Sequence, residues 1–165
     1  MMGDVEFYSA TLYRYALVDL EKLCENLQED EDLARNAALA FLQAFTLTLP
    51  KGKQNTFAAH NPPLFVAFRV GEGLPRNLAT AFEKPIWPQE TKSLAGLSVE
   101  ALLREWEKFD KAYGNLESEW IGLLNLSDGE LVYHRDKLKE DYDDLLRGAE
   151  EAAKILLQRK EKEEA

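Results

Sequence analysis

The chain has a single cysteine, two histidines and no hydrophobic run long enough to span a membrane. Because Cys24 has no partner within the chain, an intramolecular disulfide is excluded and a reducing, cytoplasmic setting is expected. Cys24 lies at helical spacing from Leu20, Leu23 and Leu27, which predicts a thiol packed in a core. The first residues lack the basic start of a signal peptide. We therefore expect a cytoplasmic protein that has no membrane partner.

Motifs for catalysis and for metal binding are also missing. His60, His134 and Cys24 fall in three different predicted elements, and no spacing matches a zinc site, a phosphate-binding loop or a dinucleotide fingerprint. Carboxylates are numerous, but none lies on an apolar stretch beside a base, where its pKa would be raised. The sequence therefore predicts no metal, no cofactor and no enzymatic activity.

Positive charge is scarce, with 20 Lys and Arg side chains against 30 Asp and Glu and a net charge of −10. Such a balance argues against a whole surface that attracts nucleic acid. Residues 51–89 are the exception, because they hold five basic and two acidic side chains, whereas the regions before and after are both acidic. Any contact with nucleic acid is expected in this middle segment.

The first predicted element is a long strand over residues 7–18, which are rich in aromatic and β-branched side chains and contain no glycine or proline. Apolar side chains fall on both of its faces, which is typical of a central strand. Arg14 is the one charge in this run, and burial without a partner would be costly. Its guanidinium is expected either to form an ion pair with a neighbouring strand or to face a ligand.

Two helices and a second strand follow. Asp19 is a candidate N-cap for a short helix, and residues 32–48 form a longer helix that Pro50 ends. The apolar residues of that longer helix at three- and four-residue spacing are Leu33, Ala37, Phe41, Ala44 and Phe45. With Ala34, Ala38, Leu39, Leu42 and Leu47 the helix is apolar around most of its girth, which is typical of a core element packed on a sheet. Residues 54–60 form an extended segment, and residues 64–70 form a strand after the break at 61–63. The order strand, helix, strand, strand matches most of the ferredoxin-like pattern of many RNA-binding domains and predicts an α+β fold.

The remainder of the chain is predicted to be mainly helical, with a short helix or a helical turn over residues 74–82. Ser98 is expected to cap a helix over residues 99–113 that ends at Gly114. Residues 127–130 match a capping box for a final helix starting at Leu131. The predicted seam of that helix has heptad spacing and comprises Arg135, Leu138, Tyr142, Leu145, Ala149, Ala152 and Leu156. This seam is expected to pack on its own domain or on another molecule. Residues 120–126 are apolar but short, and their spacing does not define an element.

One short segment has the composition of a phosphate-binding site. Lys51 and Lys53 flank a glycine that allows close approach of the backbone, and amide and hydroxyl groups follow at Gln54, Asn55 and Thr56. Such groups suit phosphate and ribose oxygens without reading bases, and Phe57 offers a stacking face. A solvated turn with two surface lysines fits the same spacing equally well.

The chain also resembles the C-terminal half of the CasC family, the repeated backbone subunit of type I-E CRISPR Cascade complexes. The most specific shared motif is KQNTFAAHNP at residues 53–62, supported by YRYA at 13–16 and AFEK at 81–84. The similarity covers roughly residues 7–115.

The resemblance implies an RNA-holding structural subunit that performs no catalysis. Such subunits have a modified RNA-recognition (ferredoxin-like) palm, stack along a CRISPR RNA and present its bases to target DNA, so that base pairing reads the sequence. The implied partners are therefore CRISPR RNA, target DNA through the guide, copies of the same subunit and other Cascade subunits. Residues 1–90 are expected to form part of the palm, and residues 91–165 a helical region packed on it or on a neighbour.

Family members are considerably longer than this chain. We therefore expect a C-terminal fragment, an internally initiated product or one piece of a split subunit whose N-terminal half is supplied by a separate chain. The alternative is a standalone helical module that oligomerises through its C-terminal helix and no longer binds RNA.

Overall fold

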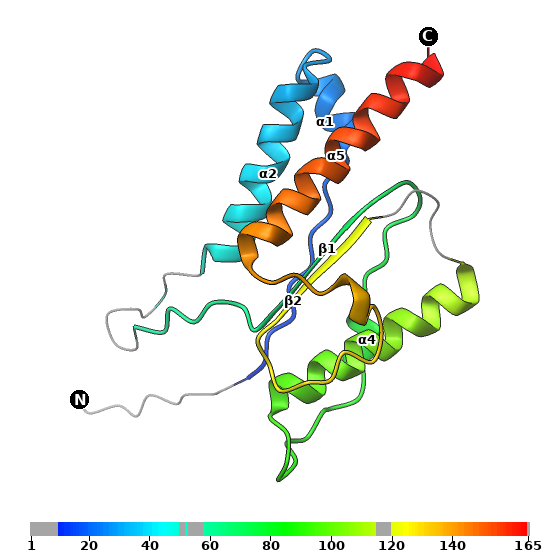
Figure 1. The fold of residues 1–165 in the computed structure, drawn as a ribbon. Coiled ribbons are helices and arrows are strands. Elements are labelled where there is room, and N and C mark those ends of the chain that lie inside the picture. The colour runs from blue at the N-terminus through cyan, green and yellow to red at the C-terminus, as the bar shows by residue number, and fades with distance from the viewer. Residues whose placement is uncertain (1–9, 50–51, 53–57, 115–119, 165) are drawn as a thin grey trace, which may run out of the picture.

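The computed structural model describes residues 10–49, 52, 58–114 and 120–164. It confirms the predicted α+β class, because helices pack around a small sheet (Figure 1). The longer elements are α1 (Leu20–Asn26), α2 (Glu31–Leu47), β1 (Phe65–Val70), α4 (Leu94–Tyr113), β2 (Trp120–Asn125) and α5 (Tyr142–Glu164). Two 3₁₀ turns, η1 (Ala79–Phe82) and η2 (Arg135–Lys137), lie between them.

The two strands form an antiparallel sheet in which Phe65 lies opposite Asn125 and Val70 lies opposite Trp120. Because successive side chains of a strand point to opposite faces, the adjacent buried residues Leu123 and Leu124 of β2 belong to two different hydrophobic clusters. The sheet is therefore the middle layer of the molecule, with α4 on one side and α5 on the other (Figure 1).

The first face of the sheet is covered by α4. Leu102, Leu103 and Trp106 of this helix form a cluster with Ile121 and Leu123 of β2. The helix begins at the N-cap Ser93, whose hydroxyl oxygen accepts from the backbone N–H of Gly96, and ends as predicted at Gly114, which has a φ of 76°.

The second face is covered by α5, with Leu42 of α2 at the margin of the same cluster. Leu145 is fully buried against side chains of both strands. Two glycines allow this close packing: a Cβ atom on Gly122 or on Gly148 would lie within 2.4 Å of the Trp120 ring. The helix and the strand can approach each other because neither glycine has a side chain beneath the indole.

A third, smaller cluster joins α1, α2 and α5 through Cys24, Ala34 and Leu157. Asp19 caps α1 as predicted, accepting from the N–H of Lys22. The prediction that Cys24 is a packed core thiol is confirmed, because this free cysteine is buried.

The predicted strand over residues 7–18 does not form within its described part. Residues 10–19 are extended without strand pairing, and residues 7–9 lie outside the described residues. The side-chain pattern was suited to a strand, but no described strand pairs with it, and a lone extended segment gains no ladder of hydrogen bonds. By contrast, the strand expected over residues 64–70 is confirmed as β1, and the apolar residues 120–126 contain β2.

The apolar girth predicted for α2 is buried only in part. Ala34, Ala38 and Thr46 are buried, whereas Leu33 and Phe41 are exposed. The fully buried positions of α2 therefore carry small side chains.

Two predicted helix starts are wrong because long-range contacts override local signals. Ser98 lies inside α4, where its hydroxyl donates to the carbonyl of Leu94, and the cap is Ser93. The apparent capping box at residues 127–130 forms a loop, and α5 begins only at Tyr142. Of the predicted heptad seam, Leu145 and Ala149 are buried within the chain itself. The short helix or helical turn predicted over residues 74–82 is present as the 3₁₀ turn η1.

No described helix is both long enough and apolar enough to cross a membrane.

The packing of α5 can be tested with a pair of substitutions on this one helix. Leu145→Ala should lower the free energy of unfolding by about 2–5 kcal/mol, because a fully buried leucine leaves a cavity between α5 and the sheet. The matched change Ile155→Ala, at a side chain that is 56% exposed, should alter it by less than about 0.5 kcal/mol. Urea denaturation would measure both, and equal effects would contradict the packing described for α5.

Candidate nucleic-acid interface

The five residues predicted to contact RNA, Lys51, Lys53, Gln54, Asn55 and Thr56, lie outside the described residues, as does Phe57. Their contact with nucleic acid therefore stays a prediction. Gly52 is described and exposed, and no described residue other than its chain neighbours has an atom within 4 Å of the position that a Cβ would take. The structure places the two ends of this segment, and these ends define the candidate interface.

Residues 51–57 follow the C-terminus of α2, and the side chain of Arg14 contacts this helix end. Its Nη1 donates to the carbonyl of Thr48 at 3.3 Å, and its guanidinium lies 4.3 Å from the centre of the Phe45 ring. A cation is favoured at a helix C-terminus, where carbonyl groups point outward, and over an aromatic face. The partners of Arg14 are a helix end and a ring, and not the strand ion pair that was one of its two predicted alternatives; the other alternative, a contact with a ligand, stays a prediction. Its side chain is exposed and adds positive charge at the C-terminus of α2.

The other end of the segment is a turn that leads into β1. Ala58 has a φ of 47°, and the N–H of His60 donates to its carbonyl at 2.9 Å. The carbonyl of Leu64 then accepts from the N–H of Leu126 at 2.8 Å, which continues the pairing of β1 with β2. The segment is therefore connected to a packed helix on one side and to the sheet on the other.

Two of the five basic side chains in residues 51–89 are engaged inside the molecule. Arg76 forms an ion pair with Asp110 of α4, and its Nη2 donates to the carbonyl of Gly114 at 2.6 Å. Asp110 is only 2% exposed. Burial lowers the pKa of Arg69 on β1, and the nearby Asp110 opposes that shift. The charge that counting assigns to this segment is therefore partly engaged in contacts within the fold.

The same carboxylate holds two residues that precede α5. The hydroxyl of Tyr133 donates to Oδ2 of Asp110 at 3.0 Å, and burial together with this bond raises the pKa of Tyr133 to about 12. The ring of His134 lies 4.8 Å from the ring of Trp106, and burial lowers the pKa of His134. Sequence reasoning missed this cluster because Arg76, Asp110 and Tyr133 are far apart in the chain.

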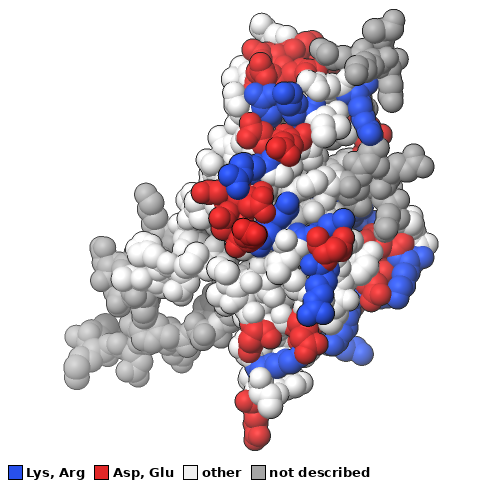
Figure 2. All heavy atoms as spheres, viewed as in Figure 1, with Lys and Arg blue, Asp and Glu red and all other residues white. Residues whose placement is uncertain are grey.

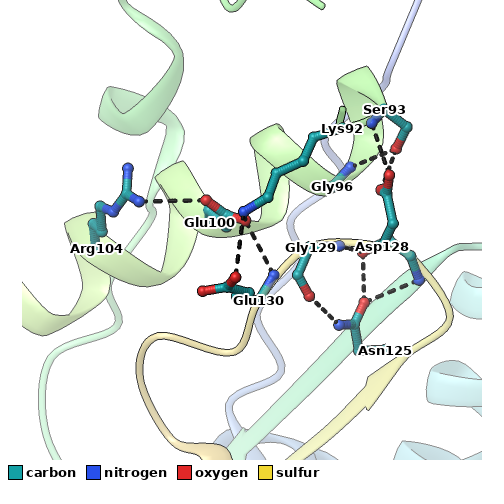
Figure 3. Close-up of polar contacts among 10 residues, drawn as sticks. Lys92, Ser93, Gly96, Glu100, Arg104, Asn125, Asp128, Gly129 and Glu130 are labelled. Carbon is teal, nitrogen blue, oxygen red and sulfur yellow. Dashed lines mark hydrogen bonds and ion pairs between the residues drawn. The ribbon is translucent and has the colours of Figure 1, made fainter. Parts of the chain in front are cut away.

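A second polar network joins the start of α4 to the loop after β2 (Figure 3). Lys92 pairs with Glu100 at 2.6 Å and with Glu130 at 3.6 Å. The other oxygen of Glu100 is 3.3 Å from Arg104, and the N–H of Glu130 donates to Glu100 at 3.1 Å. The hydrogen bonds from Lys92 and Glu130 lower the pKa of Glu100, so this buried carboxylate is ionised.

The loop itself is held by Asp128, which accepts from both the N–H and the hydroxyl of Ser93 (Figure 3). Gly129 packs so closely that an added Cβ would lie 2.4 Å from the carbonyl oxygen of Gly96. The side chain of Asn125 donates to the carbonyl of Gly129 at 3.0 Å. These contacts explain why residues 127–130 form a loop. Their polar groups form hydrogen bonds with Ser93 at the start of α4 and with Asn125 of β2, instead of capping a new helix.

The networks around Asp110 and Glu100 stabilise the fold, and they pair charges that would otherwise form surface patches of one sign. Figure 2 shows acidic and basic side chains interspersed over the face that it draws, and uncharged surface where residues 58–64 run in Figure 1. Among the described residues, no group of three or more His, Cys, Asp or Glu side chains is arranged to hold a metal ion.

The network around Glu100 predicts an acid-sensitive contribution to stability. Because the folded-state pKa of Glu100 lies below its ordinary value of 4.5, its contribution is present above pH 4.5 and is lost as the pH falls through the folded-state pKa. Glu100→Gln should lower the free energy of unfolding by about 1–3 kcal/mol at pH 7 and flatten its dependence on pH below about 4.5.

Urea denaturation at several pH values would measure both effects. Glu107→Gln is the matched control, because Glu107 pairs with Lys111 on the surface of the same helix. A Glu100→Gln variant with unchanged stability and an unchanged pH profile would contradict the role assigned to this carboxylate.

A family model described as CT1975-like protein matches residues 1–146 of the chain. No curated protein matches it. Two solved structures are similar. A chain of a "CRISPR RNA-guided surveillance complex" superposes with a TM-score of 0.72 and 28% identity, over 82% of this chain and 50% of that one. A chain of a "CRISPR RNA-guided surveillance complex, pre-nicking" gives a TM-score of 0.72 and 26% identity, over 82% of this chain and 39% of that one.

These matches confirm the resemblance to a CRISPR surveillance subunit at the level of the complex. They also show that the chain spans half or less of the length of the two solved chains it matches.

Proposed function

Because the chain belongs to the CT1975-like family, we propose that it is a structural subunit of a CRISPR RNA-guided surveillance complex, in which it holds the backbone of the guide RNA. The observation that carries this proposal is the superposition of 82% of the chain on a subunit of such a complex, with 28% identity. The sequence motif at residues 53–62 supports the finer assignment to the CasC backbone subunit of type I-E Cascade.

The partners in this proposal are those of an RNA-guided assembly. CRISPR RNA contacts the subunit directly, and target DNA pairs with the guide bases, so the protein does not read sequence. Copies of the same subunit and other Cascade subunits lie next to it along the RNA.

The chemistry at the interface is contact with phosphate and ribose. Lys51 and Lys53 neutralise phosphates, and Gln54, Asn55 and Thr56 donate to backbone oxygens. Arg14, exposed at the C-terminus of α2, adds a third cation beside the segment. The acidic remainder of the surface repels RNA and confines it to this region.

The proposal assigns the subunit no catalytic step. His134 and Tyr133 are held inside the fold by Asp110 and Trp106, so these two titratable groups do not face a substrate. Cleavage of nucleic acid in this scheme belongs to another protein.

The RNA contact can be tested by removing two charges from the candidate segment. Lys51→Ala/Lys53→Ala should weaken binding of single-stranded RNA by a similar factor for unrelated sequences, because phosphates are sequence-independent. Loss of two phosphate contacts should reduce the slope of log affinity against log salt by about 1.4. Fluorescence anisotropy at several salt concentrations would measure both quantities.

The matched control is Lys108→Ala/Lys111→Ala, which removes the same charge from the surface of α4, where both lysines pair with carboxylates. It should leave RNA affinity nearly unchanged. Identical binding isotherms for the Lys51/Lys53 variant and the unmodified chain would remove this segment from the RNA site.

A further inference from the structure

An open groove of about 150 Å³ lies between α5 and the end of the sheet at which β1 ends and β2 begins. Its apolar lining comprises Val70, Trp120, Gly148, Ala152, Ile155 and Leu156. An apolar cavity of this volume can bind a benzene-sized ring. The groove is therefore large enough for one aromatic side chain.

The α5 wall of the groove also carries two charged side chains. Glu151, Ile155 and Arg159 follow one another at intervals of four residues, so they share one face of the helix with Ile155 in the middle. Ile155 is 56% exposed, whereas Leu145 and Ala149 of the predicted seam are buried within the chain. The α5 residues of the groove all lie after residue 146, the last residue that the family model matches. This face of α5 is therefore open to another molecule and separate from the region that carries the family match.

An aromatic side chain suited to such a groove is exposed in the loop that joins η1 to α4. Trp87 is 75% exposed. It lies between Pro85 and Pro88, and a residue that precedes a proline is confined to extended backbone. Lys92 holds the far end of the loop through its ion pair with Glu100 of α4. A tryptophan on a rigid segment loses little conformational entropy on binding, and tryptophan is enriched among the residues that dominate protein interfaces.

The loop of Trp87 and the groove lie on opposite sides of the sheet. Leu78 and Phe82, which precede the loop, pack in the cluster on the α4 side. The groove is bounded by α5, which covers the other face. In Figure 1 the loop before α4 lies at the bottom of the view, far from the place where the ends of the strands meet α5. Trp87 therefore cannot enter the groove of its own chain.

We propose that Trp87 of one copy of the chain inserts into the groove beside Ile155 of a second copy. The contact joins two different surfaces, so each pair of copies keeps one free groove and one free Trp87. Heterologous contacts of this kind continue into rings or open chains instead of stopping at a dimer.

The charges around the two surfaces agree with one orientation of this contact. Lys84 and Glu90 are exposed and flank Trp87, each three residues away along the chain. Glu151 and Arg159 flank Ile155 on the groove. When Lys84 faces Glu151, Glu90 faces Arg159, so that both pairs are of opposite sign and fix the direction in which the loop enters.

A protein surface suits Trp87 better than RNA does. The exposed charges closest to it in sequence are Glu83, Lys84 and Glu90, which together are negative and repel phosphates. The contact thus goes beyond the proposed function, because it uses neither the guide RNA nor residues 51–57.

The test is sedimentation equilibrium of the full chain without RNA, over a wide range of protein concentration. The unmodified chain should form oligomers that grow beyond a dimer. Trp87→Ala should raise the dissociation constant at least about thirtyfold, as for other tryptophans that anchor an interface. Ile155→Glu, which places a charge in the groove, should have a similar effect. The matched control Leu74→Ala removes another exposed apolar side chain, 83% exposed, and should change nothing.

Mixing the two defective variants tests whether the contact joins different surfaces. The Trp87→Ala chain keeps an intact groove, and the Ile155→Glu chain keeps an intact Trp87. An equimolar mixture should therefore form a dimer that does not grow further, although each variant alone is monomeric. Both substituted side chains are exposed, and circular dichroism would verify that the variants are folded.

Several outcomes would overturn the inference. These are an unmodified chain that stays monomeric, association that Leu74→Ala weakens as much as Trp87→Ala does, a mixture of the two variants that stays monomeric, and RNA binding by the monomer that Trp87→Ala weakens. The Lys51→Ala/Lys53→Ala variant should associate normally. Failure of the RNA test therefore leaves this inference standing, and failure of the association test leaves the RNA proposal standing.

Discussion

The fold depends on the need to cover both faces of a two-stranded sheet. A lone pair of strands is marginally stable in water, so each face requires a helix packed on it. The adjacent residues Leu123 and Leu124 point into different clusters, and α4 and α5 each bury one of them. The polar networks also hold α4 on the sheet, because Asp110 and Glu100 of α4 bind residues of the loop that follows β2. Helices distant in sequence are thereby held on one sheet.

Local sequence signals predicted those elements that local contacts decide. The cap at Asp19, the strand over residues 64–70 and the end of α4 at Gly114 are all present. The predictions failed where a distant partner decides. Ser93 caps α4 together with Asp128, 35 residues later, so the plausible cap at Ser98 is unused. A periodicity also cannot tell which face of α2 is turned inward, because that depends on how closely its neighbours approach.

The candidate site shows the same limit. Counting charges identified the basic middle segment, but the count cannot show that Asp110 of α4 binds Arg76, nor that burial affects Arg69. It also assigned no role to Arg14 at the end of a helix, because Thr48 is 34 residues away. Spacing alone left two readings of the lysines beside Gly52 equally open, and the family resemblance favours the prediction that they contact RNA. Residue chemistry predicts a class of ligand, whereas tertiary contacts determine which basic side chains are already paired within the fold.

The placement of the tryptophans allows unfolding to be followed by fluorescence. Trp106 is 4% exposed in the layer beneath α4, and Trp120 lies under α5, beside Gly122 and Gly148. Trp87 is 75% exposed and serves as an internal reference. Each layer thus carries its own fluorophore, in an environment different from that of the other. Removing one indole at a time would allow the emission of each layer to be followed separately, and would show whether the two layers melt as one cooperative unit or in succession.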